Sequence, residues 1–238
     1  ALIYLLFSAT LSSQNVLHPV LIANLLILPA LMKFFGTYRS ENSLSLVFDA
    51  SFLFSCASLI YWPVIITIPV CFIAVFILKS VELREWILMI MGIILPFLIT
   101  ATLFWVCNID FTYWQTSFDQ TFSAIHTPFF PPGSFLINTY AILLMSLAFI
   151  YMFSNGFGGK VKTKKNKYVL IWLIFPGISV AFFTIEPNVF ICIAAIIPFS
   201  ILIGDYLSSI KKTGVADFLI LLLITIVILS NLQTKSVL

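Results

Sequence analysis

Residues 46–78 read LVFDASFLFSCASLIYWPVIITIPVCFIAVFIL, an apolar stretch with a single acidic residue. As one helix this stretch would be about 50 Å long at 1.5 Å per residue, whereas the hydrocarbon core of a bilayer is about 30 Å thick. Tyr61-Trp62-Pro63 interrupts it, because proline lacks a backbone donor and disfavours a helical residue before it. The stretch is therefore either one kinked helix or two short helices.

The placement of basic residues decides between these two arrangements. Lys33 and Arg39 precede the stretch, and Lys79 and Arg84 follow it. Basic loops stay on the cytoplasmic side of a membrane. If the stretch turns back in its middle, eleven of the twelve Lys and Arg residues share that side, whereas a single crossing lowers the number to nine. We therefore predict a pair of short helices that meet near the outer leaflet, 46–60 and 63–78.

The composition of the chain is that of an integral membrane protein. Of its 238 residues, 61% are hydrophobic and 9% are charged, and the mean hydropathy is +1.14. Soluble domains carry about 25% charged residues, so this chain lacks the polar surface that water requires. The net charge of +3 reflects membrane topology and contact with anionic headgroups rather than nucleic-acid binding.

Further apolar runs flank the predicted pair. They are residues 1–11, 17–36, 86–106, 134–153, 168–185, 189–207 and 215–232. Together with the pair they predict an all-α integral membrane fold, a polytopic helical bundle of about eight to nine transmembrane segments in a single domain, 1–238. The first run is too short to span and begins with Ala, so we expect the chain to be an N-terminally truncated piece of a longer protein.

The longest connection, residues 107–133, contains no Lys or Arg. Its aromatic and aliphatic residues recur at three- and four-residue steps, which places them on one face of a helix. These residues are Phe111, Trp114, Phe118, Phe122 and Ile125. We predict an extracytoplasmic amphipathic helix, 108–126, that lies in the membrane interface. It is either an aromatic belt segment that seals the bundle or a lid over a cavity that faces lipid.

Four ionisable residues on the extracytoplasmic connections are candidate catalytic residues: Asp110, Asp119, His126 and Glu186. Two carboxylates that converge can share acid and base roles, or hold a divalent cation against a pyrophosphate. That cation is the one cofactor the sequence suggests, and it belongs to this hypothesis alone. The alternative is that these residues are ordinary solvated groups of an outer loop.

Three acids lie inside apolar runs, each within about one turn of a predicted cytoplasmic end: Asp49, Asp205 and Asp217. We expect the dipole of a helix N-terminus to stabilise Asp49 and Asp217. Asp205 is near a C-terminus, so it needs a cationic partner, for which we predict Lys211 or Lys212. A proton relay would require an acid nearer mid-span, which argues against a proton-coupled transporter.

Two other patterns predict no chemistry. Gly156-Phe157-Gly158-Gly159 precedes the lysine run 160–167, but Val161 follows Gly159-Lys160 where a phosphate-binding loop needs Ser or Thr. The run is interpreted as a basic anchor in contact with anionic lipid. The four cysteines lack metal-ligand spacing. Cys107 and Cys192 fall near the outer face, where a disulfide is permitted, although free buried cysteine is common.

Several segments resemble an uncharacterised family of Bacteroidota inner-membrane proteins. They are Phe48-Asp49-Ala50-Ser51-Phe52, Ala57-Ser58-Leu59-Ile60-Tyr61, Leu83-Arg84-Glu85-Trp86 and the stretch from Ile197-Pro198 to Lys212. The resemblance covers most of the chain and implies a polytopic membrane protein with no assigned activity. A weaker likeness is to membrane glycosyltransferases that use polyprenyl phosphate, which also have short helix pairs and an outer horizontal helix. Their acidic residue in the first outer loop has no counterpart in residues 12–15.

The sequence leaves three functions open, all in a bacterial inner membrane with the basic loops in the cytoplasm and 107–133 outside. The first is a non-catalytic component or subunit of a cell-envelope assembly, favoured because no catalytic constellation is complete. The second is a lipid-linked glycosyl or phosphoglycosyl transferase at the outer face, with a polyprenyl-phosphate lipid as partner. The third is a transporter of lipid or small molecules. No nucleic-acid partner is expected.

Overall fold

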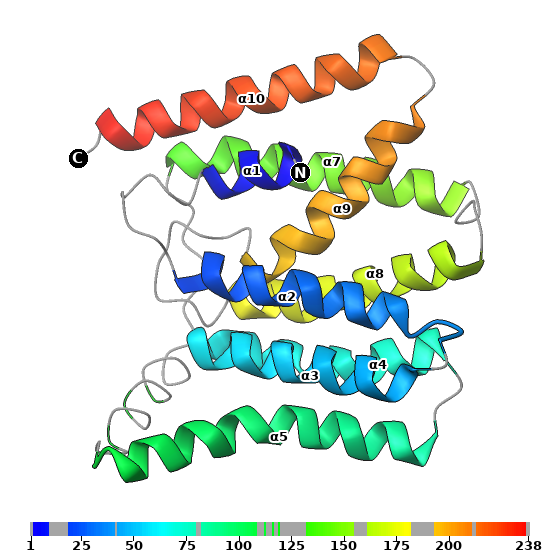
Figure 1. The fold of residues 1–238 in the computed structure, drawn as a ribbon. Coiled ribbons are helices and arrows are strands. Elements are labelled where there is room, and N and C mark those ends of the chain that lie inside the picture. The colour runs from blue at the N-terminus through cyan, green and yellow to red at the C-terminus, as the bar shows by residue number, and fades with distance from the viewer. Residues whose placement is uncertain are drawn as a thin grey trace.

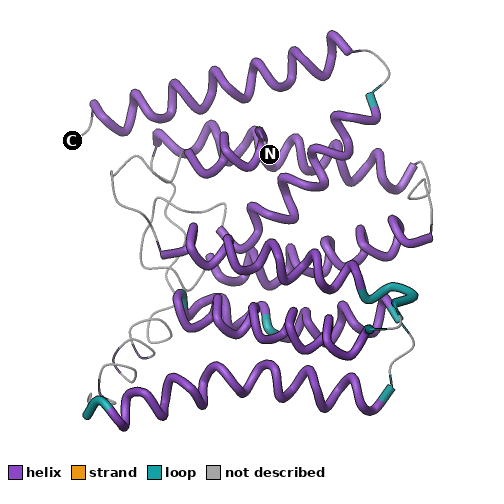
Figure 2. The backbone as a smooth tube through the Cα atoms, in the orientation of Figure 1, coloured by secondary structure: helices purple, strands orange, loops and turns teal. Residues whose placement is uncertain are grey.

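A computed structural model describes residues 2–9, 19–40, 42–79, 82–108, 112, 116, 119, 132–154, 161–181, 193–210 and 213–236. These residues form helices and turns, and none of them is in a strand (Figure 2). The helices are α1 (Leu2–Ala9), α2 (Pro19–Gly36), α3 (Ser43–Ile60), the 3-10 helix η2 (Trp62–Thr67), α4 (Pro69–Leu78), α5 (Leu83–Val106), α7 (Pro132–Ser154), α8 (Val161–Ala181), α9 (Ile193–Ser209) and α10 (Thr213–Ser236). The predicted all-α fold class is confirmed.

The helices lie side by side in a stack of rows, in which α3 runs antiparallel to α2 and parallel to α5 (Figure 1). Helix α5 forms one edge of the stack and packs mainly on α3, and α10 forms the opposite edge and packs mainly on α7. Helix α9 crosses the stack obliquely and contacts α1, α2, α7 and α8. Among the described helices, α9 therefore links the row of α1 and α7 to the row of α2 and α8.

The apolar stretch 46–78 turns back on itself, as predicted. Helix α3 ends at Ile60, and Tyr61 is extended with φ −139° and ψ 102°. Prolines lie in the first turns of η2 and α4, where a missing N–H leaves no helical hydrogen bond unmade. Lys79 Nζ at the end of α4 donates to Ser43 Oγ at the start of α3 over 3.0 Å. The hairpin is thus established, while the 3-10 conformation of 62–67 is a feature that the sequence did not predict.

Three of the described helices are long and apolar enough to cross a membrane: α2, α3 and α5. Four shorter apolar helical segments accompany them, at 62–78, 138–154, 195–209 and 214–229. These lengths and compositions indicate a membrane protein. The number of eight to nine spanning segments stays a prediction.

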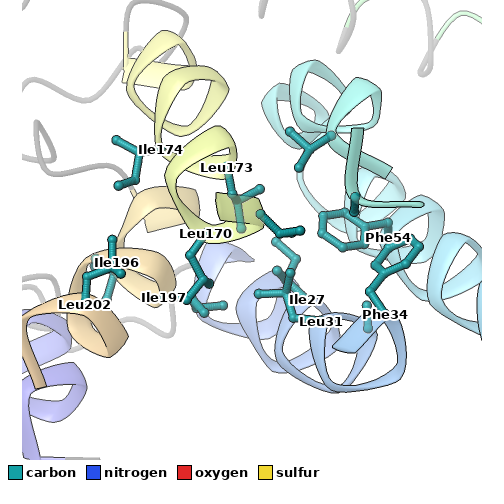
Figure 3. Close-up of a cluster of buried hydrophobic side chains, with 14 of the residues drawn as sticks. Ile27, Leu31, Phe34, Phe54, Leu170, Leu173, Ile174, Ile196, Ile197 and Leu202 are labelled. Atoms are coloured by element: carbon teal, nitrogen blue, oxygen red, sulfur yellow. The ribbon is translucent and has the colours of Figure 1, made fainter. Parts of the chain in front are cut away.

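The apolar core lies where α2, α3, α8 and α9 meet (Figure 3). Phe34 of α2 and Phe54 of α3 are both about 1% exposed, and their ring centroids are 6.0 Å apart. Leu170 and Leu173 of α8 face Ile27 and Leu31 of α2, and Ile196, Ile197 and Leu202 extend the cluster along α9. In a bilayer such contacts act by close packing, since lipid is as apolar as the core.

Small residues bring α5 close to α3. A Cβ added at Gly92 would collide with Ser51 Oγ and lie 2.8 Å from the Phe48 carbonyl oxygen. One turn further along α3, Ser55 Oγ donates to the Ile93 carbonyl over 2.6 Å. Glycine and serine at membrane helix interfaces allow backbones to approach and bond in this way.

Candidate functional site

Of the four candidate catalytic residues predicted on the outer connections, the structure describes Asp119 alone. It is helical and exposed, as are Thr112 and Thr116, and Thr116 Oγ1 donates to the Thr112 carbonyl over 2.9 Å. Asp110, His126 and Glu186, like most of the predicted interfacial helix 108–126, lie outside the described residues. Convergence of the four groups stays a prediction.

Polar contacts between described helices gather at the other end of the bundle, which we call the basic end. There α2, α4 and α9 finish and α3, α5 and α8 begin (Figure 1). Four lysines from three segments meet carboxylates or carbonyls of neighbouring helices: Lys33, Lys79, Lys165 and Lys167. The basic end is therefore the best-formed polar region of the described chain.

A buried carboxylate connects three helix ends here. Glu85, in the first turn of α5, is 1% exposed. Its Oε1 lies 2.7 Å from Lys79 Nζ and accepts a hydrogen bond from Ser43 Oγ over 2.8 Å. Its Oε2 is buried and has no hydrogen-bond partner among the described residues. We call Ser43, Lys79 and Glu85 the Glu85 triad; the ammonium group makes burial of the carboxylate tolerable, because an unpaired buried charge is strongly destabilising.

Two further ion pairs tie adjacent helices. Lys33 Nζ of α2 lies 2.6 Å from Asp49 Oδ2 of α3. Lys167 Nζ of α8 lies 2.6 Å from Asp205 Oδ2 of α9. Asp205 thus has the cationic partner that its position requires, and this partner is Lys167. The predicted partners, Lys211 and Lys212, lie outside the described residues. Lys167 precedes Asp205 by 38 residues in the chain and belongs to α8, which packs beside α9.

The positions of the other two intramembrane acids also follow from the helix starts. Helix α3 begins at Ser43, so Asp49 lies in its second turn and is stabilised by Lys33 rather than by the first-turn backbone groups. Asp217 is exposed near the N-terminus of α10, where the helix dipole favours a carboxylate.

A second cluster involves the turn between α2 and α3. Arg39 has φ 57°, the left-handed region that non-glycine residues seldom occupy. Its Cζ lies 5.5 Å from the centroid of the Tyr38 ring, and Lys165 Nζ lies 5.3 Å from the same centroid. Lys165 Nζ also donates to the Leu78 carbonyl at the end of α4 over 3.1 Å. We call Tyr38, Arg39 and Lys165 the Tyr38 cluster.

With this geometry in view, the chain can be compared with known proteins. A family profile described as "Family of unknown function (DUF6427)" matches residues 1–236. The chain belongs to the DUF6427 family. No curated protein and no solved structure matches it. The predicted resemblance to an uncharacterised family over most of the chain is therefore confirmed, while the Bacteroidota source and the glycosyltransferase likeness stay predictions.

Sequence reasoning did not find the Glu85 triad of this DUF6427 protein. The predicted apolar run begins at residue 86, but α5 begins at Leu83 and carries Glu85 inward. Ser43 and Glu85 are 42 residues apart in the chain, and no local spacing relates them. The available signal is the acidic residue Glu85, which directly precedes the apolar run 86–106.

No group of three or more His, Cys, Asp or Glu residues that could hold a metal ion occurs in the described part of the chain. Cys56, Cys71 and Cys107 are free thiols, and Cys107 is exposed. Cys192 lies outside the described residues. The described polar groups at the basic end form ion pairs and hydrogen bonds between helix ends.

Proposed function

We propose that this DUF6427 protein is a non-catalytic membrane component, a subunit of a cell-envelope assembly in the bacterial inner membrane. The observation that carries the proposal is the use of polar groups at the basic end. The Glu85 triad joins α3, α4 and α5, and the ion pairs of Lys33 and Lys167 join α2 to α3 and α8 to α9. Such contacts fix the relative positions of helices, which is what a scaffold requires.

We further propose that the basic end faces the cytoplasm and the connection 107–133 faces outward. The distribution of basic residues supports this orientation. Two tryptophans of α5 support the position of this helix across the membrane. Trp86 and Trp105 lie near its two ends and are 37% and 75% exposed. Tryptophan is enriched at both interfaces of a membrane, so the apolar face of α5 between them is covered by acyl chains.

The transferase hypothesis differs from this proposal in one testable requirement. A transferase at the outer face needs its acidic groups, whereas a scaffold does not. The experiment places three genes in a deletion strain: the wild type, the triple variant Asp110→Ala/Asp119→Ala/Glu186→Ala, and the control Glu82→Ala, which removes an exposed acid at the basic end. Growth under envelope stress and the size of the complex on native gels are measured.

We expect the triple variant to restore growth as the wild type does and to migrate in the same complex, which is larger than the 26.8 kDa chain in its detergent micelle. A triple variant that reaches the membrane at the normal level but fails to restore growth would establish a chemical role for the outer acids. Migration of the wild type as a monomer in native lipid discs would exclude a subunit role.

A further inference from the structure

The first two turns of α8 carry an unusual concentration of positive charge. Lys162, Lys164, Lys165 and Lys167 lie at the N-terminal end of the helix, where the helix dipole is already positive and cations are disfavoured. Lys167 is neutralised by Asp205. No ion pair with a described carboxylate is formed by the other three. An anion from outside the described chain would remove this repulsion.

The wider charge balance at this end points the same way. The described residues at this end include eight basic and five acidic ones: Lys33, Arg39, Lys79, Arg84, Lys162, Lys164, Lys165 and Lys167 against Asp49, Glu82, Glu85, Asp205 and Asp217. Three of these acids are used by the described ion pairs. The excess charge is cationic and lies at the level where helices leave the apolar region.

The Tyr38 cluster concentrates part of this excess at one place. The cationic groups of Arg39 and Lys165 come from different segments, yet both lie within 5.5 Å of the centroid of one ring. The Leu78 carbonyl holds Lys165 in position, and the left-handed φ of Arg39 is a local strain that the fold maintains. Arg39 is exposed, and Tyr38 and Lys165 are partly exposed, so an anion can reach them from solvent or from the membrane interface.

We propose that the Tyr38 cluster binds the phosphate group of an anionic phospholipid. Guanidinium and ammonium groups bind phosphate oxygens through charge-assisted hydrogen bonds, and the tyrosine hydroxyl adds another donor. Basic pockets between membrane helices on the cytoplasmic side recognise anionic headgroups in this manner. The lipid phosphate supplies the counter-charge that Arg39 and Lys165 do not find among the described carboxylates.

The test uses the purified full chain in mixed micelles that contain equal amounts of phosphatidylglycerol and phosphatidylcholine. Native mass spectrometry counts the lipids that remain bound as the phosphatidylglycerol concentration is varied. The test variant is Arg39→Gln/Lys165→Gln. The matched control is Arg84→Gln/Lys162→Gln, which removes the same two charges from exposed positions at the same end. The measurement is independent of membrane orientation and of the proposed scaffold role.

We expect the wild type and the control to retain one phosphatidylglycerol in preference to phosphatidylcholine. The test variant should bind it about a hundred-fold more weakly, since each charge-assisted hydrogen bond to the phosphate contributes about a ten-fold factor or more. The charge-preserving variant Arg39→Lys/Lys165→Arg should bind within a few-fold of the wild type, which separates lost charge from lost folding. An equal loss in the test variant and the control, or no preference for phosphatidylglycerol, would overturn the proposal.

Inorganic phosphate distinguishes the source of the phosphate group. We expect phosphatidylglycerol to remain bound when inorganic phosphate is added in large excess, because the lipid is also held by its acyl chains. Displacement by inorganic phosphate at concentrations comparable to the lipid would overturn the lipid assignment.

Discussion

Gly92 is the residue whose missing side chain lets α5 lie against α3. Replacement by alanine puts a methyl group against Ser51 Oγ and the Phe48 carbonyl, and the hydrogen bond from Ser55 to the Ile93 carbonyl holds the two helices together at the same place. We expect Gly92→Ala to lower the free energy of unfolding by about 1–3 kcal/mol. The measurement is thermal or denaturant unfolding in detergent, followed by helical circular dichroism.

Gly214→Ala is the matched control for this substitution. Nothing lies within 4 Å of a Cβ added at Gly214, and alanine is the better helix former by up to about 1 kcal/mol. Unchanged or slightly raised stability is expected. A Gly92→Ala variant as stable as the control would mean that α5 is not held by close packing at this point.

Single residues also show where sequence reasoning ends. The need of Asp205 for a cation followed from its place near a helix C-terminus. The identity of its partner, Lys167, could not be predicted in this way, because it depends on the packing of α8 against α9 in the tertiary structure. Glu85 shows the same limit more strongly, since two of its three neighbouring helix ends come from outside α5.

The Glu85 triad couples the ends of α3, α4 and α5. Lys79→Met leaves the Glu85 carboxylate buried without its cation, so we expect a loss of about 3–5 kcal/mol in the free energy of unfolding. The double variant Lys79→Met/Glu85→Leu removes the uncompensated charge and should lose less than the single one. Unfolding of the four members of this double-mutant cycle is measured in the same detergent.

Lys33→Met serves as the comparison for this cycle. Lys33 and Asp49 are 38% and 42% exposed, so solvent screens their attraction and the loss should be below about 1 kcal/mol. Equal losses for Lys33→Met and Lys79→Met would show that burial does not set the strength of these pairs.

The hairpin of α3 and α4 was predictable because two independent signals agreed. Pro63 and its aromatic neighbours marked the break, and the basic residues on both sides required the chain to return. The 3-10 helix between them was not predictable, because the conformation of 62–67 depends on packing against α8 as well as on its own residues.

The orientation of the whole protein in the membrane can be tested with one native and one introduced thiol. Cys107 is exposed at the C-terminal end of α5, and Thr163 is exposed at the start of α8, at the basic end. We expect a membrane-impermeant maleimide to label Cys107 of a Cys192→Ser variant in intact spheroplasts. Thr163→Cys, in a chain that also carries Cys107→Ser and Cys192→Ser, should be labelled only after permeabilisation. The reverse pattern would invert the proposed orientation.

The oblique path of α9 has a consequence for the order of synthesis. This helix begins at Ile193, yet it packs on α1 and α2, near the start of the chain. A Cβ added at Gly204 would lie 3.7 Å from Ile3 Cδ1, so residues separated by about two hundred positions are neighbours. While the ribosome is still making α7 and α8, the faces of α1 and α2 that later contact α9 are not yet covered by it. Completion of the fold is therefore a late, post-insertion event that depends on the last quarter of the polypeptide.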